Sequence, residues 1–117
     1  MIDVAADRFE ELVADALDGI PDGLARYIDN VVVVVEDGSV RGRLLGRYEG
    51  VPLTRRDSWY GAVHFTMPDR ITIFRLPTCA ACATEAEVVE QVRITVVHEV
   101  AHHFGIDDAR LDALGWG

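Results

Sequence analysis

Five consecutive valines, at positions 31–35, restrict the fold of this chain more than any other part of the sequence. Valine branches at Cβ, which limits its rotamers in a helix and favours the extended backbone of a strand. Asn30 precedes the run and the turn-forming pair Asp37 and Gly38 follows it, so both ends are marked. An unbroken apolar run is typical of a strand covered on both faces, and we predict a buried strand here.

Further strands are predicted on the C-terminal side of this run. The stretch Ile71–Phe74 is mostly apolar with one polar position, and Pro77 follows it, which indicates a second strand that ends at the proline. A short strand is predicted over residues 44–48, and residues 62–65 are a candidate partner for the second strand.

An amphipathic helix is predicted at the N-terminal side. Apolar residues recur at helical spacing over residues 4–17, with Asp3 as a candidate N-cap and Gly19 as a stop. A longer helix is predicted from Thr84, which precedes an acidic first turn, to His102. Gly105 would end this helix, and a short last helix would follow it.

The order of these elements predicts an α+β fold. A small mixed sheet would pack against the N-terminal helix and the long C-terminal helix, in a single domain of residues 1–117. Cys79 and Cys82 are the two cysteines, and a lone CxxC is weak support for a metal site or a redox pair. We predict a loop with reduced or occasionally bridged thiols between the second strand and the long helix.

The formal net charge of −9 disfavours nucleic acid and anionic membranes as partners, because both require a basic surface. No stretch reaches the roughly 18 apolar residues of a membrane span, and the first residues lack a basic segment followed by an apolar run. We expect a monomeric cytoplasmic protein that binds neither nucleic acid nor membrane.

The segment "VVHEVAHHFGIDD", residues 96–108, carries the chemistry. His98 and His102 lie four residues apart, so a helix places both imidazoles on one face within reach of one metal ion. Nitrogen ligands favour zinc. Glu99 lies on the same turn as His98, where its carboxylate can take the proton of an attacking water as a general base.

A catalytic zinc site needs a third protein ligand and an open position. Gly105 can reverse the chain beyond the helix end and bring Asp108 back toward the histidines. Asp107 and Asp112 are alternatives, and either can instead cap the last helix. His103 points about 100° away from His102 around the helix, which disfavours it as a ligand.

This pattern, HExxHxxGxxD, resembles the zincin metallopeptidases, and the chain looks like the minimal zincin-like family of small bacterial proteins. The segments "LLGRYEGVPLTRR", "PDRITIFRLP" and "TVVHEVAHHFGIDDARLDALG" carry the resemblance. It implies a zincin-like fold with a short sheet beside the active-site helix and an edge strand open to an extended peptide. By motif position it implies zinc ligands His98, His102 and Asp108, with Glu99 as the general base.

The sequence therefore predicts a zinc-dependent metallopeptidase that hydrolyses peptide bonds in a peptide or protein substrate through a zinc-activated water. A non-catalytic zinc-stabilised module that binds or senses a peptide is the alternative, and a hydrolase of non-peptide amides has the same ligands. The oxyanion-stabilising group is left open among Tyr48, Tyr60, His64 and the arginines of residues 41–56.

Overall fold

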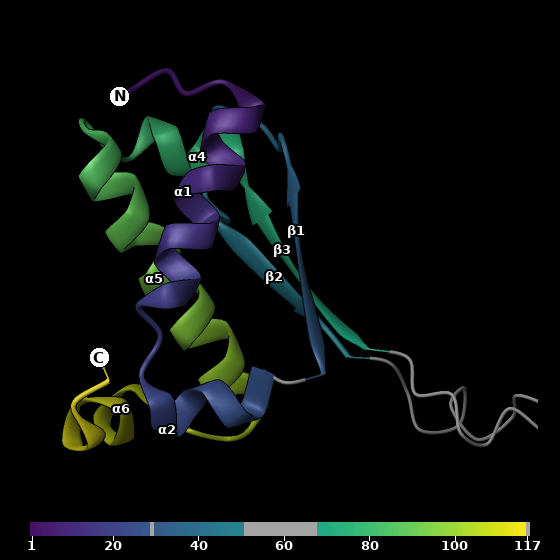
Figure 1. The fold of residues 1–117 in the computed structure, drawn as a ribbon, viewed down its shortest axis with the longest axis vertical. Coiled ribbons are helices and arrows are strands. Elements are labelled where there is room, and N and C mark those ends of the chain that lie inside the picture. The colour runs from purple at the N-terminus through teal and green to yellow at the C-terminus, as the bar shows by residue number, and fades with distance from the viewer. Residues whose placement is uncertain (29, 51–67, 117) are drawn as a thin grey trace, which may run out of the picture.

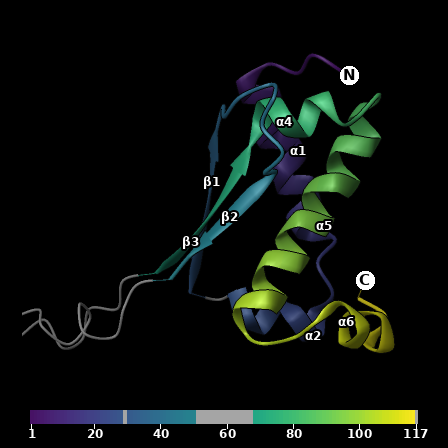
Figure 2. The ribbon, with the colours of Figure 1, turned by 180° about the vertical axis from the view of Figure 1, so that it is seen from behind.

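The structure of the chain, a computed structural model, describes residues 1–28, 30–50 and 68–116. A small sheet forms one layer, and the helices lie together on one side of it (Figures 1 and 2). The elements in chain order are α1 (Ala6–Asp18), α2 (Asp22–Ala25), the 3₁₀ turn η1 (Arg26–Ile28), β1 (Val31–Glu36), β2 (Gly46–Glu49), β3 (Asp69–Phe74), α4 (Arg75–Ala80), α5 (Glu85–His103) and α6 (Asp108–Leu114).

The sheet is mixed, in the order β1-β3-β2. β3 pairs in parallel with β1, where Val33 lies opposite Ile71, and antiparallel with β2, where Tyr48 lies opposite the same Ile71. The central strand β3 is the buried one, since Ile71, Thr72 and Ile73 are inaccessible to solvent. The predicted α+β fold with a small mixed sheet is therefore confirmed.

The prediction that the valine run is buried is wrong. β1 is an edge strand in the described part of the sheet, its other valines are half-buried, and the side chain of Val32 is 44% exposed. A continuous apolar run shows that a strand is favoured, but it does not show how many neighbours the strand has. The candidate partner at residues 62–65 lies outside the described residues, and β3 pairs instead with β1 and β2.

Helix α1 supplies one wall of the core. Phe9, Leu12, Val13 and Ala16 are buried along one side of it, as the helical spacing predicts, and Gly19 is its C-cap. The predicted N-cap is wrong: α1 begins after Ala5, whose side chain has no oxygen to accept a capping hydrogen bond.

Helix α5 begins and ends close to the predicted positions. The Thr84 side chain accepts a hydrogen bond from the Glu87 backbone N–H at 3.1 Å, and the Glu87 carboxylate accepts one from the Ala83 N–H at 3.0 Å. These two bonds satisfy N–H groups that the first turn of a helix leaves unpaired. The valines at 88, 92, 96 and 100 are buried along the helix, which fixes its rotation against α1 and the sheet.

The CxxC segment is not the predicted loop. Strand β3 ends at Phe74, and Pro77 lies in the first turn of α4, where a missing N–H costs nothing. Cys79 belongs to α4 and Cys82 follows it, and both are buried with free thiols. Burial raises the pKa of both thiols, which keeps them in the unreactive protonated form.

Strand β2 approaches α5 most closely at Gly46. A Cβ atom at this position would lie 2.6 Å from Thr95 Cγ2 and 3.1 Å from the Thr72 carbonyl oxygen. The Thr95 hydroxyl donates a hydrogen bond to the Gln91 carbonyl at 2.8 Å, which holds its methyl group in place. The absence of a side chain at Gly46 thus lets β2 lie directly beside the helix that carries the histidines.

We expect Gly46→Ala to destabilise the protein by about 1–3 kcal/mol, because the added methyl group forces β2 away from α5. The measurement is the free energy of unfolding from a denaturant titration. Gly19→Ala is the matched control, since a Cβ there meets its nearest atom at 3.5 Å, an ordinary contact. Equal unfolding midpoints for the two variants would contradict the close approach.

Candidate metal centre

The two histidines of the motif lie on consecutive turns at the C-terminal end of α5. The ring centroids of His98 and His102 are 5.8 Å apart, and the rings are tilted by 40°. His98 is half-buried and His102 is exposed. The helix thus presents both imidazoles from one side, as the four-residue spacing predicts.

The chain reverses directly after α5. Gly105 has a φ of +80°, a left-handed backbone conformation that residues other than glycine rarely adopt. Its N–H donates to the His102 carbonyl at 3.1 Å, and the Ile106 N–H donates to the Ala101 carbonyl at 2.8 Å. This pair of bonds is the Schellman motif, which ends a helix and turns the chain back along it.

The reversal brings Asp108 to His102. The Asp108 Oδ1 atom lies 3.1 Å from His102 Nε2. Asp107, one of the two alternatives, caps α6 by accepting a hydrogen bond from the Arg110 N–H at 2.8 Å. Asp112, the other alternative, is exposed within α6. Of these three aspartates, Asp108 is therefore the one whose carboxylate contacts a histidine in this structure.

Two observations bear on whether these side chains suit a metal ion. Two imidazoles and a carboxylate are a common donor set for zinc, and two donors on one tetrahedral zinc are separated by about 3.3 Å, close to the spacing of His102 and Asp108. However, no three His, Cys, Asp or Glu side chains within residues 1–28, 30–50 and 68–116 are grouped as a metal site. The donor types and the spacing of His102 and Asp108 fit zinc. His98, His102 and Asp108 are not all close enough in this structure to form a three-residue group.

Glu99 follows His98 on α5 and is half-buried. Within the described residues its carboxylate has no hydrogen-bond or ion-pair partner. A carboxylate without a partner beside the two imidazoles is available to accept a proton from a nearby water.

His103 faces the sheet, unlike its neighbour His102. Its ring stacks on Tyr48 with centroids 3.9 Å apart, and its Nε2 atom lies 3.9 Å from Asp69 Oδ2. The Tyr48 hydroxyl donates a hydrogen bond to the same carboxylate oxygen at 2.6 Å. This contact was not foreseen from the sequence, since it depends on the pairing of β2 with β3. It joins the C-terminal end of α5 to the sheet.

The candidates for oxyanion stabilisation are only partly described. Tyr60, His64 and the arginines at 55 and 56 lie outside the described residues. The Tyr48 hydroxyl is hydrogen-bonded to Asp69, and Arg47 forms an ion pair with Glu49 at 3.1 Å. Arg41 and Arg43 are exposed between β1 and β2.

The comparisons with known proteins bear on the family of the chain. No curated protein matches the chain. No helix in the described part of the chain is long and apolar enough to cross a membrane.

The family model described as zincin-like metallopeptidase matches residues 28–116, which is well over half of the chain and includes the sheet, α5 and α6. The chain therefore belongs to the zincin-like metallopeptidase family.

Proposed function

We propose that the chain is a zinc-dependent peptidase in which His98, His102 and Asp108 bind the metal and Glu99 is the general base. The observation that carries the proposal is the contact of Asp108 with His102 at 3.1 Å, in a chain of the zincin-like metallopeptidase family. The Schellman motif at Gly105 explains this contact, so the glycine and the aspartate of the motif have a joint structural role.

Bound zinc would supply Lewis acidity at the scissile carbonyl and promote deprotonation of a water molecule. Glu99 accepts the proton of the attacking water, and the same proton can then pass to the leaving amine as the C–N bond breaks. The position of Glu99 beside His98 on one turn of α5 places the base next to a proposed ligand. Activity would thus depend on the rigidity of this helix end.

The edge strand β2 is the proposed binding surface for the substrate. It pairs with β3 along one edge, and no strand of the described residues pairs with its other edge. An extended peptide can add to such an edge through backbone hydrogen bonds. Because β2 lies against α5 at Gly46, a peptide on this edge would run beside the helix that carries His98 and His102.

The first test of the proposed ligands compares two neighbouring aspartates. Asp108→Asn should lower zinc affinity by more than about tenfold, since even the loss of a residue that only supports a ligand costs that much. Asp107→Asn should keep zinc, because asparagine caps a helix as well as aspartate does. The measurement is metal content by elemental analysis together with a zinc competition titration, with His98→Ala as a second ligand variant.

The two variants remove the same charge at adjacent positions, so a general electrostatic effect would change both alike. Equal zinc affinity in Asp108→Asn and the wild type would contradict the proposed third ligand. Equal loss of zinc affinity in both variants would indicate a general electrostatic effect and would also contradict a specific role of Asp108 as ligand.

The test of the base is Glu99→Gln, which should retain zinc and lower the rate of peptide cleavage by roughly 10²–10⁴-fold. Cleavage of a peptide library, followed by mass spectrometry, gives the rate. Glu10→Gln, the same substitution at an exposed position of α1, should keep both zinc and activity. Full activity of Glu99→Gln would exclude Glu99 as the base.

A zinc-stabilised module that holds a peptide without cutting it remains the second candidate, since the three proposed ligands would serve it equally well. It predicts unfolding on chelation and no cleavage by the wild type of any library peptide. A cytoplasmic location, a monomeric state and a single domain over residues 1–117 also remain predictions.

A further inference from the structure

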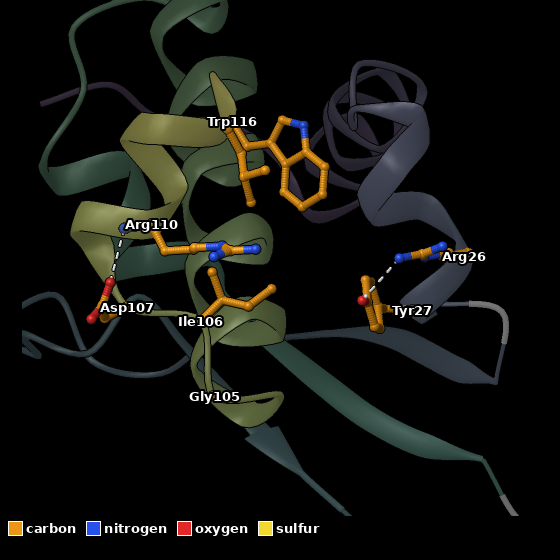
Figure 3. Close-up of a pocket in the computed structure, with 8 residues that line it drawn as sticks. Arg26, Tyr27, Gly105, Ile106, Asp107, Arg110 and Trp116 are labelled. Atoms are coloured by element: carbon orange, nitrogen blue, oxygen red, sulfur yellow. Dashed lines mark hydrogen bonds between the residues drawn. The ribbon is translucent and has the colours of Figure 1, made fainter.

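A pocket of about 390 Å³ lies between η1 and the segment that follows α5 (Figure 3). This volume falls within the usual range for sites that bind a small ligand. Its walls come from three parts of the chain: η1, the loop between α5 and α6, and α6 with the residues after it. The residues that define its chemistry are Arg26, Tyr27, Ile106, Asp107, Arg110 and Trp116.

Two guanidinium groups in this pocket have no carboxylate partner. Arg26 donates a hydrogen bond to the Tyr27 hydroxyl at 3.1 Å, and the Arg110 backbone N–H binds the Asp107 carboxylate, but neither guanidinium forms an ion pair within the described residues. Figure 3 shows the Arg110 side chain extending into the space between Trp116 and Ile106.

Arg41 and Arg43, on the exposed segment between β1 and β2, also lack an acidic partner among the described residues, whereas the other described arginines outside the pocket have one. They form ion pairs at 2.7–3.1 Å with Glu or Asp: Arg8 with Glu85, Arg47 and Arg70 with Glu49, Arg75 with Asp37, and Arg93 with Glu90. The two guanidinium groups at this pocket thus carry positive charge that no acidic side chain of the described residues pairs with. An anionic ligand group would do so, through charge-assisted hydrogen bonds to the guanidinium donors.

The remaining walls of the pocket are apolar and firmly held. Trp116 packs over Gly23 of α2 so closely that a Cβ there would lie 2.5 Å from the indole ring. Tyr27 packs against Phe104, with ring centroids 5.0 Å apart. Ile106 adds an aliphatic surface beside them. A ligand that fits these walls carries an apolar group next to its anionic group.

The local charges favour a single carboxylate over a phosphate. Asp107 lies on the wall of the pocket, and the acidic chain as a whole repels a dianion more than a monoanion. We propose that the pocket binds the C-terminal residue of a peptide. The guanidinium groups of Arg26 and Arg110 engage its α-carboxylate, and its side chain packs against Ile106 and Trp116.

This assignment rests on the proposed peptidase function for the nature of the ligand, and it extends that function to the recognition of a free C-terminus. The pocket and the proposed metal centre share one loop, because Gly105, Ile106 and Asp107 line the pocket and the next residue, Asp108, contacts His102. A bound C-terminus would therefore rest against the loop that holds the proposed third ligand.

The test is isothermal titration calorimetry on full-length Glu99→Gln protein, in which cleavage is blocked, with and without added zinc. The probe is an N-acetylated tetrapeptide of three alanines and a C-terminal phenylalanine, supplied as the free acid and as the amide. We expect the acid to bind at least about tenfold more tightly than the amide, because hydrogen bonds to a charged group are lost in the amide.

Arg26→Gln and Arg110→Gln, each introduced in the Glu99→Gln background, should remove most of the preference for the acid. Arg43→Gln is the matched control, since it removes the same charge from an exposed arginine outside the pocket and should keep the preference. Thermal unfolding of each variant verifies that it is folded. Equal binding of acid and amide, or a preference that survives both pocket substitutions, would overturn the assignment.

Two further ligands identify the source of the carboxylate. N-acetylphenylalanine carries every group that the pocket is proposed to contact, so it should bind about as tightly as the tetrapeptide, and much weaker binding would overturn the assignment to the C-terminal residue. An amidated peptide with an internal glutamate that binds as tightly would overturn the requirement for a C-terminus. Zinc content and cleavage are measured separately on the wild type. A protein that prefers the acid peptide but holds no zinc would therefore contradict the proposed function and still support the pocket.

Discussion

The packing of α5 against the sheet and α1 is the constraint on which the site depends. Its valine face is buried, and its N-terminus is fixed by the reciprocal bonds of Thr84 and Glu87. Gly46 lets the edge strand β2 lie directly against the helix, and His103 stacks on Tyr48 of the same strand. The helix can neither rotate nor slide without the loss of these contacts. The neighbouring motif residues therefore keep a defined direction although they are solvent-accessible.

The patterns that could be read from the sequence were those set by local chemistry. The cap at Thr84, the helix end near Gly105 and the strand character of the valine run all depend on neighbouring residues, and all were predicted. The burial of the valines was predicted wrongly, because it depends on the number of strands beside β1 and on which sheet face the helices cover. The position of Pro77 shows the same limit, since a proline that stops a strand is equally acceptable in the first turn of a helix.

The candidate site likewise has residues that local sequence spacing predicts and contacts that depend on the fold. The spacing of His98, Glu99 and His102 placed all three on one helix without any knowledge of the fold. The motif position already favoured Asp108 over Asp107 as the third ligand, and that role stays a prediction. The structure adds that the two adjacent carboxylates take different roles: Asp107 caps α6 and Asp108 contacts His102. The contact of His103 with Asp69 of the sheet could not be predicted from the sequence, since it depends on strand register.

The two roles of the adjacent aspartates also explain why the loop after α5 is so short. The Schellman motif fixes the direction in which the chain leaves α5, and the cap at Asp107 fixes the direction in which it enters α6. Asp108 is the first residue of α6, directly after this cap, so its helical backbone leaves it little freedom to move away from His102. A longer loop would hold the same carboxylate less firmly, because each added residue brings backbone conformations that must be restricted before the contact can form. The fixed geometry of the turn and of the helix start therefore keeps the Asp108 carboxylate beside His102.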